Sequence, residues 1–323
     1  MGRPGTRPTS SSRTSPTQAF VPEVGAVPFP GYRLHRLRGI GGFSTVWEAS
    51  DQTGELIALK FMSSANPSTT ARELRSLQAI QTVTHANLLR TRDVWSVPGW
   101  IVIAMDLADA SMLDLLELYA EEFNRSIEVE KLCHYLYQAA LALDFLNRRH
   151  HRIDGKLVGL QHGDIKPNNV LILGDRAMLA DYGLATPTSG PNTPCPRHGT
   201  AEYCAPEVFQ GMLSDRSDQF GLAVTYFVLR TGRFPFPQPP TNRESLKNYV
   251  RPDANLTPLS SAERPAMLRA LSSIPQNRYP SCLDFMTALL QCQGLRAERD
   301  EDGGSKIGAH SEVIEPPKSR LFK

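Results

Sequence analysis

The chain has 323 residues, of which 41% are hydrophobic and 21% are charged. This composition supports a sizeable core and excludes a chain that is disordered throughout. The formal net charge is +2, and three arginines and one glutamate in the first 30 residues account for all of it. The remainder is neutral overall, which argues against nucleic acid as the main partner.

The five cysteines are scattered, and no pair has the spacing of zinc ligands. An odd number of cysteines fits a reducing compartment better than a disulfide framework. No apolar run approaches the roughly 18 residues needed to span a bilayer, and no secretory signal is visible near the start. We therefore expect a cytoplasmic location and no membrane segment in this chain.

Residues 1–30 hold six prolines, four serines and four threonines. Such a composition predicts a disordered arm. Residues 32–62 then read as three strands, with a glycine-rich turn at residues 39–46 and a hairpin signal at residues 51–54. The pair Asn66-Pro67 predicts the start of a helix, with asparagine as the N-cap.

Two further strands are expected near residues 88–95 and 100–105, followed by a short helix at residues 112–119. Residues 128–147 predict a strong helix, because their apolar residues recur at spacings of three and four. These apolar residues are Leu132, Leu136, Ala139, Leu143 and Leu146.

The polar stretch His162–Asn169 (HGDIKPNN) follows this helix and precedes two short strands, Val170–Leu173 and Ala177–Ala180. Beyond a proline-rich segment, the chain from Glu207 to about Gln291 reads as mostly helical. Strands first and helices later predict an α+β fold, with a small β-rich lobe and a larger, mostly helical lobe.

Several residues could carry chemistry, although each has a simpler explanation when taken alone. The glycine-rich turn could approach a phosphate or be an ordinary hairpin turn. Lys60, inside an apolar strand, could bind an anion or reach the surface with its ammonium group. Glu73 could pair with Lys60 or form a capping box with Thr70.

The polar stretch offers a carboxylate, Asp164, for a reacting hydroxyl and an amide, Asn169, for a metal ion. Asp181, followed by Tyr182-Gly183, sits at a strand end and could ligate Mg²⁺. Taken alone, Asp181 is better explained by an ordinary turn.

Taken in order, these residues and Ala205-Pro206-Glu207 resemble the signature set of the protein kinases, with similar spacings. The resemblance extends from about Tyr32 to Leu290, and Lys166 is similar to the serine/threonine marker. It implies a eukaryotic-like (Hanks-type) serine/threonine protein kinase catalytic domain with a bilobal fold. The implied boundaries are an arm (1–30), a kinase domain (31–291) with N-lobe (31–105), hinge (105–108) and C-lobe (109–291), and a tail or linker (292–323).

The resemblance also implies roles for individual residues. Lys60, held by Glu73, would grip the α- and β-phosphates of ATP. Asp164 would accept or orient the substrate hydroxyl proton, Lys166 would stabilise the γ-phosphate, and Thr200 would brace both of them. Asn169 and Asp181 would hold Mg²⁺, with Mn²⁺ as an alternative.

The implied ATP site has three parts: the glycine-rich turn over the phosphates, apolar residues around the adenine, and a hinge with Met105 as gatekeeper. Its residues are Arg38, Gly39, Ile40, Gly41, Gly42, Phe43, Ser44, Val46, Ala58, Lys60, Met105, Asp106, Leu107, Ala108 and Leu171. In the same family the counterpart of Asp218 pins the catalytic loop, and the counterparts of Glu207 and Arg278 form a structural pair.

Four positions depart from the family pattern. Gly163 replaces the arginine that receives an activation-loop phosphate in many kinases, which makes the domain a non-RD type. Tyr182 replaces phenylalanine, Ser44 replaces the third glycine, and Arg38 stands where an apolar residue usually covers the adenine. In addition, residues 148–157 are an apparent insertion, which reads as a solvated turn or a docking patch.

The resemblance implies transfer of the γ-phosphoryl group of ATP to serine or threonine hydroxyls of proteins, with autophosphorylation in trans as a further expectation. A pseudokinase scaffold is one alternative, but it would require the loss of Lys60, Asp164, Asn169 or Asp181. A small-molecule kinase of the aminoglycoside-phosphotransferase kind is another, because those enzymes also have a His-Gly-Asp loop. Residues 199–207 resemble a peptide-docking segment and favour a protein substrate.

Overall fold

The structure is a computed structural model, and the chain divides in it into two compact units. The first comprises Met1–Leu74 and Asp93–Ala104, and the second comprises Arg75–Arg92 and Met105–Lys323. The residues that the structure describes are 20–42, 44–64, 77, 81–153, 155–182, 185–188, 190, 193–194, 199–299 and 305–307. The helix predicted to start at Asn66-Pro67 lies outside these residues.

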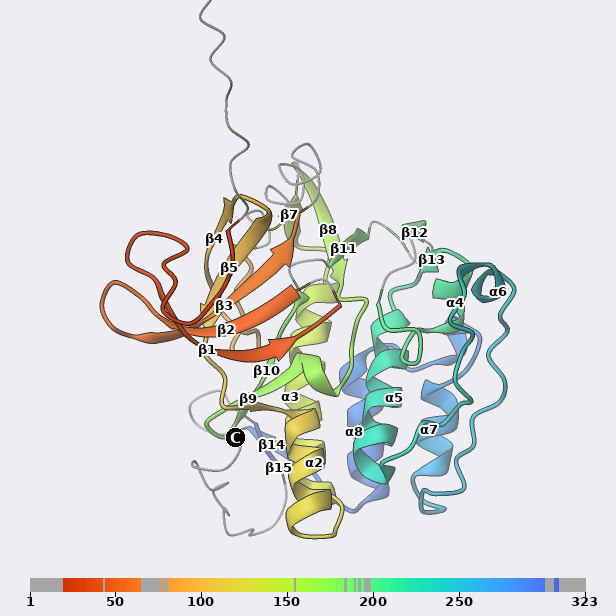
Figure 1. The fold of residues 1–323 in the computed structure, drawn as a ribbon. Coiled ribbons are helices and arrows are strands. Elements are labelled where there is room, and N and C mark those ends of the chain that lie inside the picture. Colours follow the sequence, from red (N-terminus) through yellow and green to blue (C-terminus); the bar gives the residue numbers. More distant parts are fainter. Residues whose placement is uncertain are drawn as a thin grey trace, which may run out of the picture. The chain divides into compact units, whose positions relative to one another are not determined.

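The first unit is built on a five-stranded sheet with the order β1-β2-β3-β5-β4 (Figure 1). Its strands are β1 (Arg33–Ile40), β2 (Ser44–Ser50), β3 (Leu56–Ser63), β4 (Thr91–Val97) and β5 (Trp100–Asp106). Strands β1, β2 and β3 are antiparallel neighbours. One face of the sheet carries a buried apolar cluster, because alternate residues of a strand point to the same side. The cluster contains Leu34, Trp47, Ala49, Ile57, Leu59, Phe61, Val102 and Ala104.

The end of the predicted disordered arm is ordered against this sheet. The backbone N–H of Phe20 donates to Pro98 at 2.9 Å, and its carbonyl accepts from the Trp100 indole at 2.7 Å. The Phe20 ring also stacks on Phe61, with ring centroids 5.8 Å apart. The prediction of a disordered arm therefore does not hold from Phe20 onward, because the Phe20 side chain packs against the apolar cluster of the sheet.

The second unit consists mostly of helices. Its α-helices are α2 (Met112–Glu122), α3 (Val129–Asn147), α4 (Pro206–Phe209), α5 (Ser217–Thr231), α6 (Arg243–Lys247), α7 (Arg264–Ala270) and α8 (Cys282–Cys292). Two short 3₁₀ helices, η1 (Pro167–Asn169) and η3 (Pro275–Asn277), complete the set in the described part of the unit. The fold is thus α+β and bilobal, as the sequence predicted.

Helix α5 is the centre of this unit. Every residue from Ser217 to Leu229 is buried, as expected for a helix surrounded by other elements. Helices α3 and α8 pack against it and against each other (Figure 1). The five apolar residues predicted to share one face of α3 are all fully buried. Asp144 of α3 also accepts the backbone N–H groups of Cys282 and Leu283, which caps the start of α8.

Four small sheets complete the second unit. They have the orders β10-β9-β6, β11-β8-β7, β12-β13 and β14-β15. Their strands are β6 (Ala110–Ser111), β7 (His151–Ile153), β8 (Lys156–Gln161), β9 (Val170–Leu173), β10 (Arg176–Leu179), β11 (Thr186–Thr188), β12 (Thr193–Pro194), β13 (Met212–Leu213), β14 (Ala297–Arg299) and β15 (Ser305–Ile307).

Two of these sheets differ from the sequence prediction. The apparent insertion at residues 148–157 is not a simple solvated turn, since β7 and β8 form a hairpin in which His151 faces Val158. Strands β14 and β15 form another hairpin in the segment predicted as a tail or linker. Among the helices in the described part of the chain, none is long and apolar enough to cross a membrane.

Candidate active site

Four predicted catalytic and metal residues of the second unit lie together. The Lys166 ammonium is 2.8 Å from Asp164 Oδ2 and donates a hydrogen bond of 2.7 Å to the Thr200 hydroxyl. The Thr200 backbone N–H donates to Asp164 Oδ1 at 2.8 Å. Asn169 Nδ2 donates to the Asp164 carbonyl and, at 3.1 Å, to its carboxylate. Both carboxylate oxygens of Asp164 are therefore fixed in direction.

These contacts determine the protonation state of the Asp164 carboxyl group. Burial alone would raise the pKa of this carboxyl, but the hydrogen bond and the charge of Lys166, followed by Thr200, outweigh burial and hold the pKa below its usual range. Asp164 is thus ionised at neutral pH and can accept a proton or orient a hydroxyl.

The loop around Asp164 is anchored by Asp218 at the start of α5. The backbone N–H groups of His162 and Gly163 donate to the two Asp218 oxygens at 2.8 and 2.9 Å. This confirms the expectation that Asp218 pins the catalytic loop. His162 Nε2 donates to the Ala180 carbonyl at 2.7 Å, and Nδ1 accepts the Asp164 N–H. One histidine therefore connects the loop to the strand end that precedes Asp181.

Gly163, the most conspicuous departure from the family pattern, has a backbone φ of +77°. Glycine adopts this left-handed region readily, whereas arginine at the same φ would be strained. A side chain is also excluded nearby, because a Cβ on Gly199 would lie 2.3 Å from the Gly163 carbonyl oxygen. The two glycines therefore let the catalytic loop and the docking segment (residues 199–207) approach closely.

Asn169 and Asp181 fit the requirements of a magnesium site. The Asn169 amide nitrogen donates to Asp164, so the amide oxygen is the group of this side chain that could bind a metal ion. The Ala180 N–H donates to the Asn169 carbonyl at 2.8 Å, so the two predicted ligands are tied together through the residue before Asp181. Asp181 is exposed and has φ +63°. One carboxylate and one amide oxygen are a donor set that Mg²⁺ accepts when phosphates supply further ligands.

Tyr182 is anchored in a way that phenylalanine could not be. Its side chain is buried, and its hydroxyl donates to the Leu89 carbonyl at 2.8 Å. The residue after it, Gly183, lies outside the described residues. The hydroxyl therefore fixes the chain immediately after Asp181, the predicted metal ligand.

Three predicted ATP residues of the first unit share one face of the sheet. In the register of β2 and β3, Val46 lies opposite Lys60, and Glu48 lies opposite Ala58. Directly opposed residues point to the same side, and so do alternate residues along each strand. Val46, Ala58 and Lys60 therefore lie on one face, while their neighbours Trp47 and Leu59 fill the apolar cluster on the other.

Arg38 forms an ion pair with Glu48, which lies on the same face of the sheet. The guanidinium groups of Arg36 and Arg38 lie 2.8 and 3.0 Å from Glu48 Oε2. Burial would raise the pKa of Glu48, but the two arginines hold it below its usual range. The charged end of Arg38 is thus neutralised, which leaves its aliphatic part as the portion that could cover an adenine.

The glycine-rich turn joins β1 to β2, as predicted. The Gly41 N–H donates to the Ser44 carbonyl at 2.7 Å and closes the turn. Ile40 is 77% exposed, so it takes no part in the core. Phe43 lies outside the described residues, and so does Glu73, the predicted partner of Lys60.

The predicted hinge begins at the end of β5. Met105 is buried, and Asp106 forms an ion pair of 2.6 Å with Arg92. The Asp106 N–H donates to the Arg90 carbonyl, so this N–H is not the group that would read an adenine. Leu107 and Ala108 are half-buried, as is Leu171 on β9.

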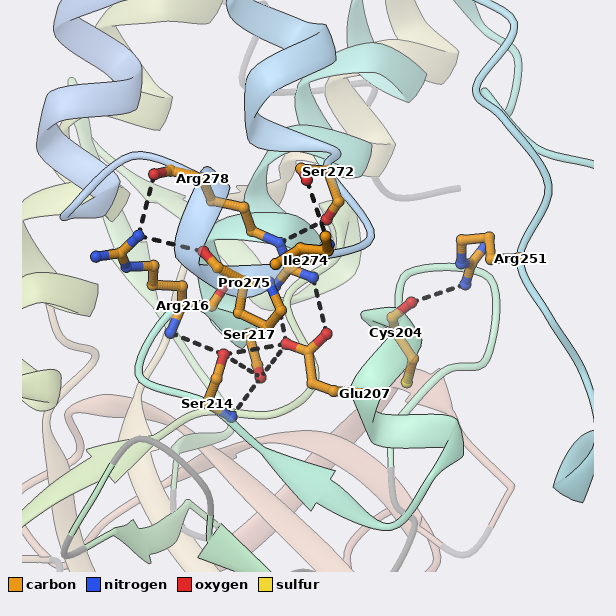
Figure 2. Close-up of polar contacts among 10 residues, drawn as sticks. All are labelled: Cys204, Glu207, Ser214, Arg216, Ser217, Arg251, Ser272, Ile274, Pro275 and Arg278. Carbon is orange, nitrogen blue, oxygen red and sulfur yellow. Dashed lines mark hydrogen bonds and ion pairs between the residues drawn. The ribbon is translucent and has the colours of Figure 1, made fainter.

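The structural pair predicted from the sequence is present. Arg278 donates two hydrogen bonds of 2.8 and 2.7 Å to the two oxygens of Glu207 (Figure 2). Burial would raise the pKa of Glu207, but Arg278 and Ser217 hold it below its usual range. Ser214 and Ser217 both donate to Glu207 Oε1. The pair fixes α4 at the end of the docking segment.

Sequence reasoning gave no role to His162, Ser214, Ser217 or Arg251, all of which hold parts of this region. His162 and the two serines flank residues that the family pattern already identifies. No sequence pattern indicated a role for Arg251, because its hydrogen-bond partners are backbone carbonyls some fifty positions earlier in the chain.

The fold and the site define a phosphotransferase domain of the protein kinase class. The family model described as "Protein kinase domain" matches residues 32–295. The chain belongs to this family, and the curated relatives PknF and PknI are named serine/threonine-protein kinases.

Three curated relatives illustrate the similarity. Serine/threonine-protein kinase PknF of Mycobacterium tuberculosis is 29% identical over 315 residues, covering 91% of this chain and 62% of the relative. PknI of Mycobacterium bovis is 28% identical over 295 residues, covering 86% and 44%. CBL-interacting protein kinase 4 of Oryza sativa subsp. japonica is 31% identical over 219 residues, covering 64% and 45%. The chain thus spans less than two thirds of the length of each of these relatives.

Proposed function

We propose that this domain is an active protein kinase that transfers the γ-phosphoryl group of ATP to serine or threonine hydroxyls of proteins. The observation that carries the proposal is the Asp164 carboxylate, which is held ionised by Lys166 and Thr200 at 2.8 Å. Membership of the protein kinase family and the serine/threonine kinase relatives support it.

In this mechanism the residues around Asp164 position and neutralise the reacting groups. Asp164 Oδ2 orients the substrate hydroxyl and receives its proton as the new oxygen–phosphorus bond forms. The bond between the γ-phosphorus and its bridging oxygen breaks, and ADP leaves with the electron pair. Lys166 lies beside Asp164 and neutralises charge on the γ-phosphoryl group. Phosphoryl transfer needs positioning and electrostatic stabilisation more than covalent participation.

ATP is proposed to bind with its phosphates under the turn at residues 39–44 and beside Lys60, with Glu73 as the partner of Lys60. The shared face of Val46 and Ala58 would cover the adenine, together with Leu171. Residues 105–108 would read the adenine edge, through groups other than the Asp106 N–H.

Asn169 and Asp181 would hold the divalent cation, for which we propose Mg²⁺, with Mn²⁺ as a substitute. The cation supplies neutralisation of the phosphate charge. This chain would supply one amide oxygen, from Asn169, and one carboxylate, from Asp181. The hydrogen bond from the Ala180 N–H to the Asn169 carbonyl keeps these two residues close together.

One regulatory feature follows from the glycine at position 163. Gly163 provides no guanidinium for a phosphate on Thr186, Thr188, Ser189 or Thr193, so we propose that activity does not depend strongly on activation-segment phosphorylation. Strand β11 supports this, because it pairs with β8 and buries the Thr188 side chain. Autophosphorylation in trans and a cytoplasmic location remain further proposals, the latter from the odd number of cysteines.

The two alternatives make different demands. A pseudokinase scaffold would not require a preorganised cluster around Asp164. In this chain Asp164, Lys166, Asn169 and Thr200 form such a cluster. A small-molecule kinase has no use for a peptide-docking segment, whereas here residues 199–207 are fixed at one end by the Glu207–Arg278 pair.

The test is transfer of labelled phosphate from ATP with Mg²⁺ to casein and, separately, to an aminoglycoside. The Asp164→Asn variant serves as the inactive enzyme, and Asp175→Asn, at an exposed turn, serves as the matched control. Label on casein serine or threonine, lost only in Asp164→Asn, is the expected result. Label on the aminoglycoside alone would favour the small-molecule kinase, and no transfer despite ATP binding would favour the scaffold.

A further inference from the structure

Arg251, which follows α6, is attached to the docking segment. Its Nη2 donates to the backbone carbonyls of Ala201 and Cys204, at 2.7 and 2.8 Å. Figure 2 shows the Cys204 contact, separate from the cluster around Glu207 and Arg278. The docking segment is therefore held at three places: by Thr200 near its start, by Arg251 in its middle and by the Glu207–Arg278 pair at its end.

The surroundings of Arg251 are unusual for a charged group. The residue is only 8% exposed, and its guanidinium carbon lies 4.6 to 5.6 Å from the centroids of three rings, Phe209, Phe220 and Phe236. Its Nε and Nη1 have no hydrogen-bond partner among the described residues. Burial lowers the pKa of Arg251, yet an arginine remains protonated in proteins.

A buried cation with two unpaired nitrogens does not favour stability on its own. Only a planar guanidinium could lie against the three rings and reach two carbonyls at once. A lysine ammonium is a compact point charge and is more strongly hydrated. The arrangement is therefore specific to arginine.

A small cavity borders the docking segment. A cavity of about 20 Å³ lies between the segment, the catalytic loop and α5, and its lining includes Asp164, Thr200 and Cys204. Inside the segment, the Ala201 carbonyl also accepts the Cys204 N–H, at 3.3 Å. The two hydrogen bonds from Arg251 therefore fix the carbonyls of Ala201 and Cys204 in the part of the segment that borders this cavity.

We propose that Arg251 is a positioning residue for the protein substrate, because it holds the docking segment in the conformation that receives a peptide next to Asp164. This inference rests on the proposed function. Arg251 touches neither ATP nor the reacting atoms, so its effect is confined to productive binding of the protein substrate.

The test compares steady-state kinetics of Arg251→Lys and Arg251→Met with those of the wild type, with casein as substrate. Methionine retains apolar contact with the rings and removes the charge, so a folded variant is available even if lysine disturbs the packing. The matched control is Arg264→Lys, since Arg264 also donates to two backbone carbonyls, of Leu259 and Thr257, away from the docking segment.

We expect the KM for casein to rise about tenfold in both Arg251 variants, as the loss of two hydrogen bonds implies. The kcat and the KM for ATP should stay within about twofold of the wild type, a change of under half a kcal/mol. Arg264→Lys should change none of them. Hydrogen exchange should become faster in the peptide containing Tyr203 and Cys204 in the Arg251 variants only.

An unchanged KM for casein, or an equal rise in Arg264→Lys, would overturn the inference while leaving the proposed function intact. If the wild type transfers no phosphate to casein, the proposed function and the substrate role of Arg251 both fail. Hydrogen exchange then still decides whether Arg251 holds the docking segment.

Discussion

The second unit contains two carboxylate clusters with similar chemistry and different exposure. Asp164 pairs with Lys166, and their side chains are 28% and 23% exposed. Glu207 pairs with Arg278, and their side chains are 11% and 0% exposed. Both carboxyls have a lowered pKa because a cation and hydroxyl groups outweigh burial.

The difference in exposure separates two roles. An ion pair as buried as Glu207–Arg278 is inaccessible to a substrate, and removing one partner leaves an uncompensated charge. A partly exposed pair contributes little to stability, yet its charges are available to a reacting group. We therefore expect substitutions at Asp164 to affect catalysis and substitutions at Glu207 to affect stability.

The largest effect is expected for Asp164→Asn, which keeps the shape of the side chain and removes its charge. Loss of the proton acceptor should lower kcat by about 10²- to 10⁴-fold. The free energy of unfolding should change by no more than about 1 kcal/mol, because the ion pair is partly exposed. Steady-state phosphoryl transfer and urea unfolding measure the two quantities, with Asp175→Asn as control.

Glu207→Gln should show the opposite pattern. Without the carboxylate, the fully buried Arg278 loses its counter-charge, and the free energy of unfolding should fall by about 3 to 5 kcal/mol. Urea unfolding measures this loss, and Glu244→Gln, at an exposed position on α6, should leave stability unchanged. A stability equal to that of the wild type would show that the pair is not structural.

Thr200→Val tests the brace of the catalytic cluster. It removes the hydroxyl that accepts from Lys166 and keeps the backbone N–H that donates to Asp164. One hydrogen bond to a charged group is lost, so kcat should fall about tenfold. Thr200→Ser keeps the hydroxyl and should retain most of the activity. Equal activities of the two variants would contradict the brace.

The pH dependence of stability should separate the clusters further. The folded-state pKa of Glu207 lies below its ordinary value of 4.5. Its contribution is therefore complete above that value and is lost as the pH falls through the folded-state pKa. Urea midpoints of the wild type should drop on acidification below 4.5, and those of Glu207→Gln should drop less. Parallel curves would argue against this assignment.

The smallest effect is expected from phosphatase treatment. Because Gly163 offers no guanidinium and β11 is already paired with β8, removal of phosphate from the activation segment should change kcat by less than about twofold, under half a kcal/mol. Activity at fixed ATP before and after treatment measures this, with phosphate content followed by mass spectrometry. A large loss of activity would show that phosphorylation orders the segment.

Local patterns in the sequence predicted much of this architecture. The apolar spacing from Leu132 to Leu146 predicted a helix at residues 128–147, and α3 spans Val129–Asn147. The catalytic cluster was predictable because Asp164, Lys166 and Asn169 lie within one short loop. The contact with Thr200 followed only from the family resemblance, since 34 positions separate it from Lys166.

Features that depend on distant pairing were not predictable. Strand β11 contains Pro187, which reads as a loop, but a proline is tolerated here because β11 is an edge strand. The order of the chain near Phe20 depends on aromatic partners forty or more positions away. Arg251 donates to backbone carbonyls, which every residue has. The type of residue at positions 201 and 204 therefore gave no indication of this contact.

The division between the two clusters is tested most directly by the rate of phosphoryl transfer to casein at saturating casein, ATP and Mg²⁺. The measurement uses native preparations of the wild type, Asp164→Asn and Glu207→Gln. The account predicts that folded Glu207→Gln still transfers phosphate at a rate near that of the wild type, whereas Asp164→Asn does not, although it is equally folded. Transfer by Asp164→Asn within about tenfold of the wild type, a loss of only about 1.4 kcal/mol, would contradict the assignment of Asp164 as the catalytic carboxylate.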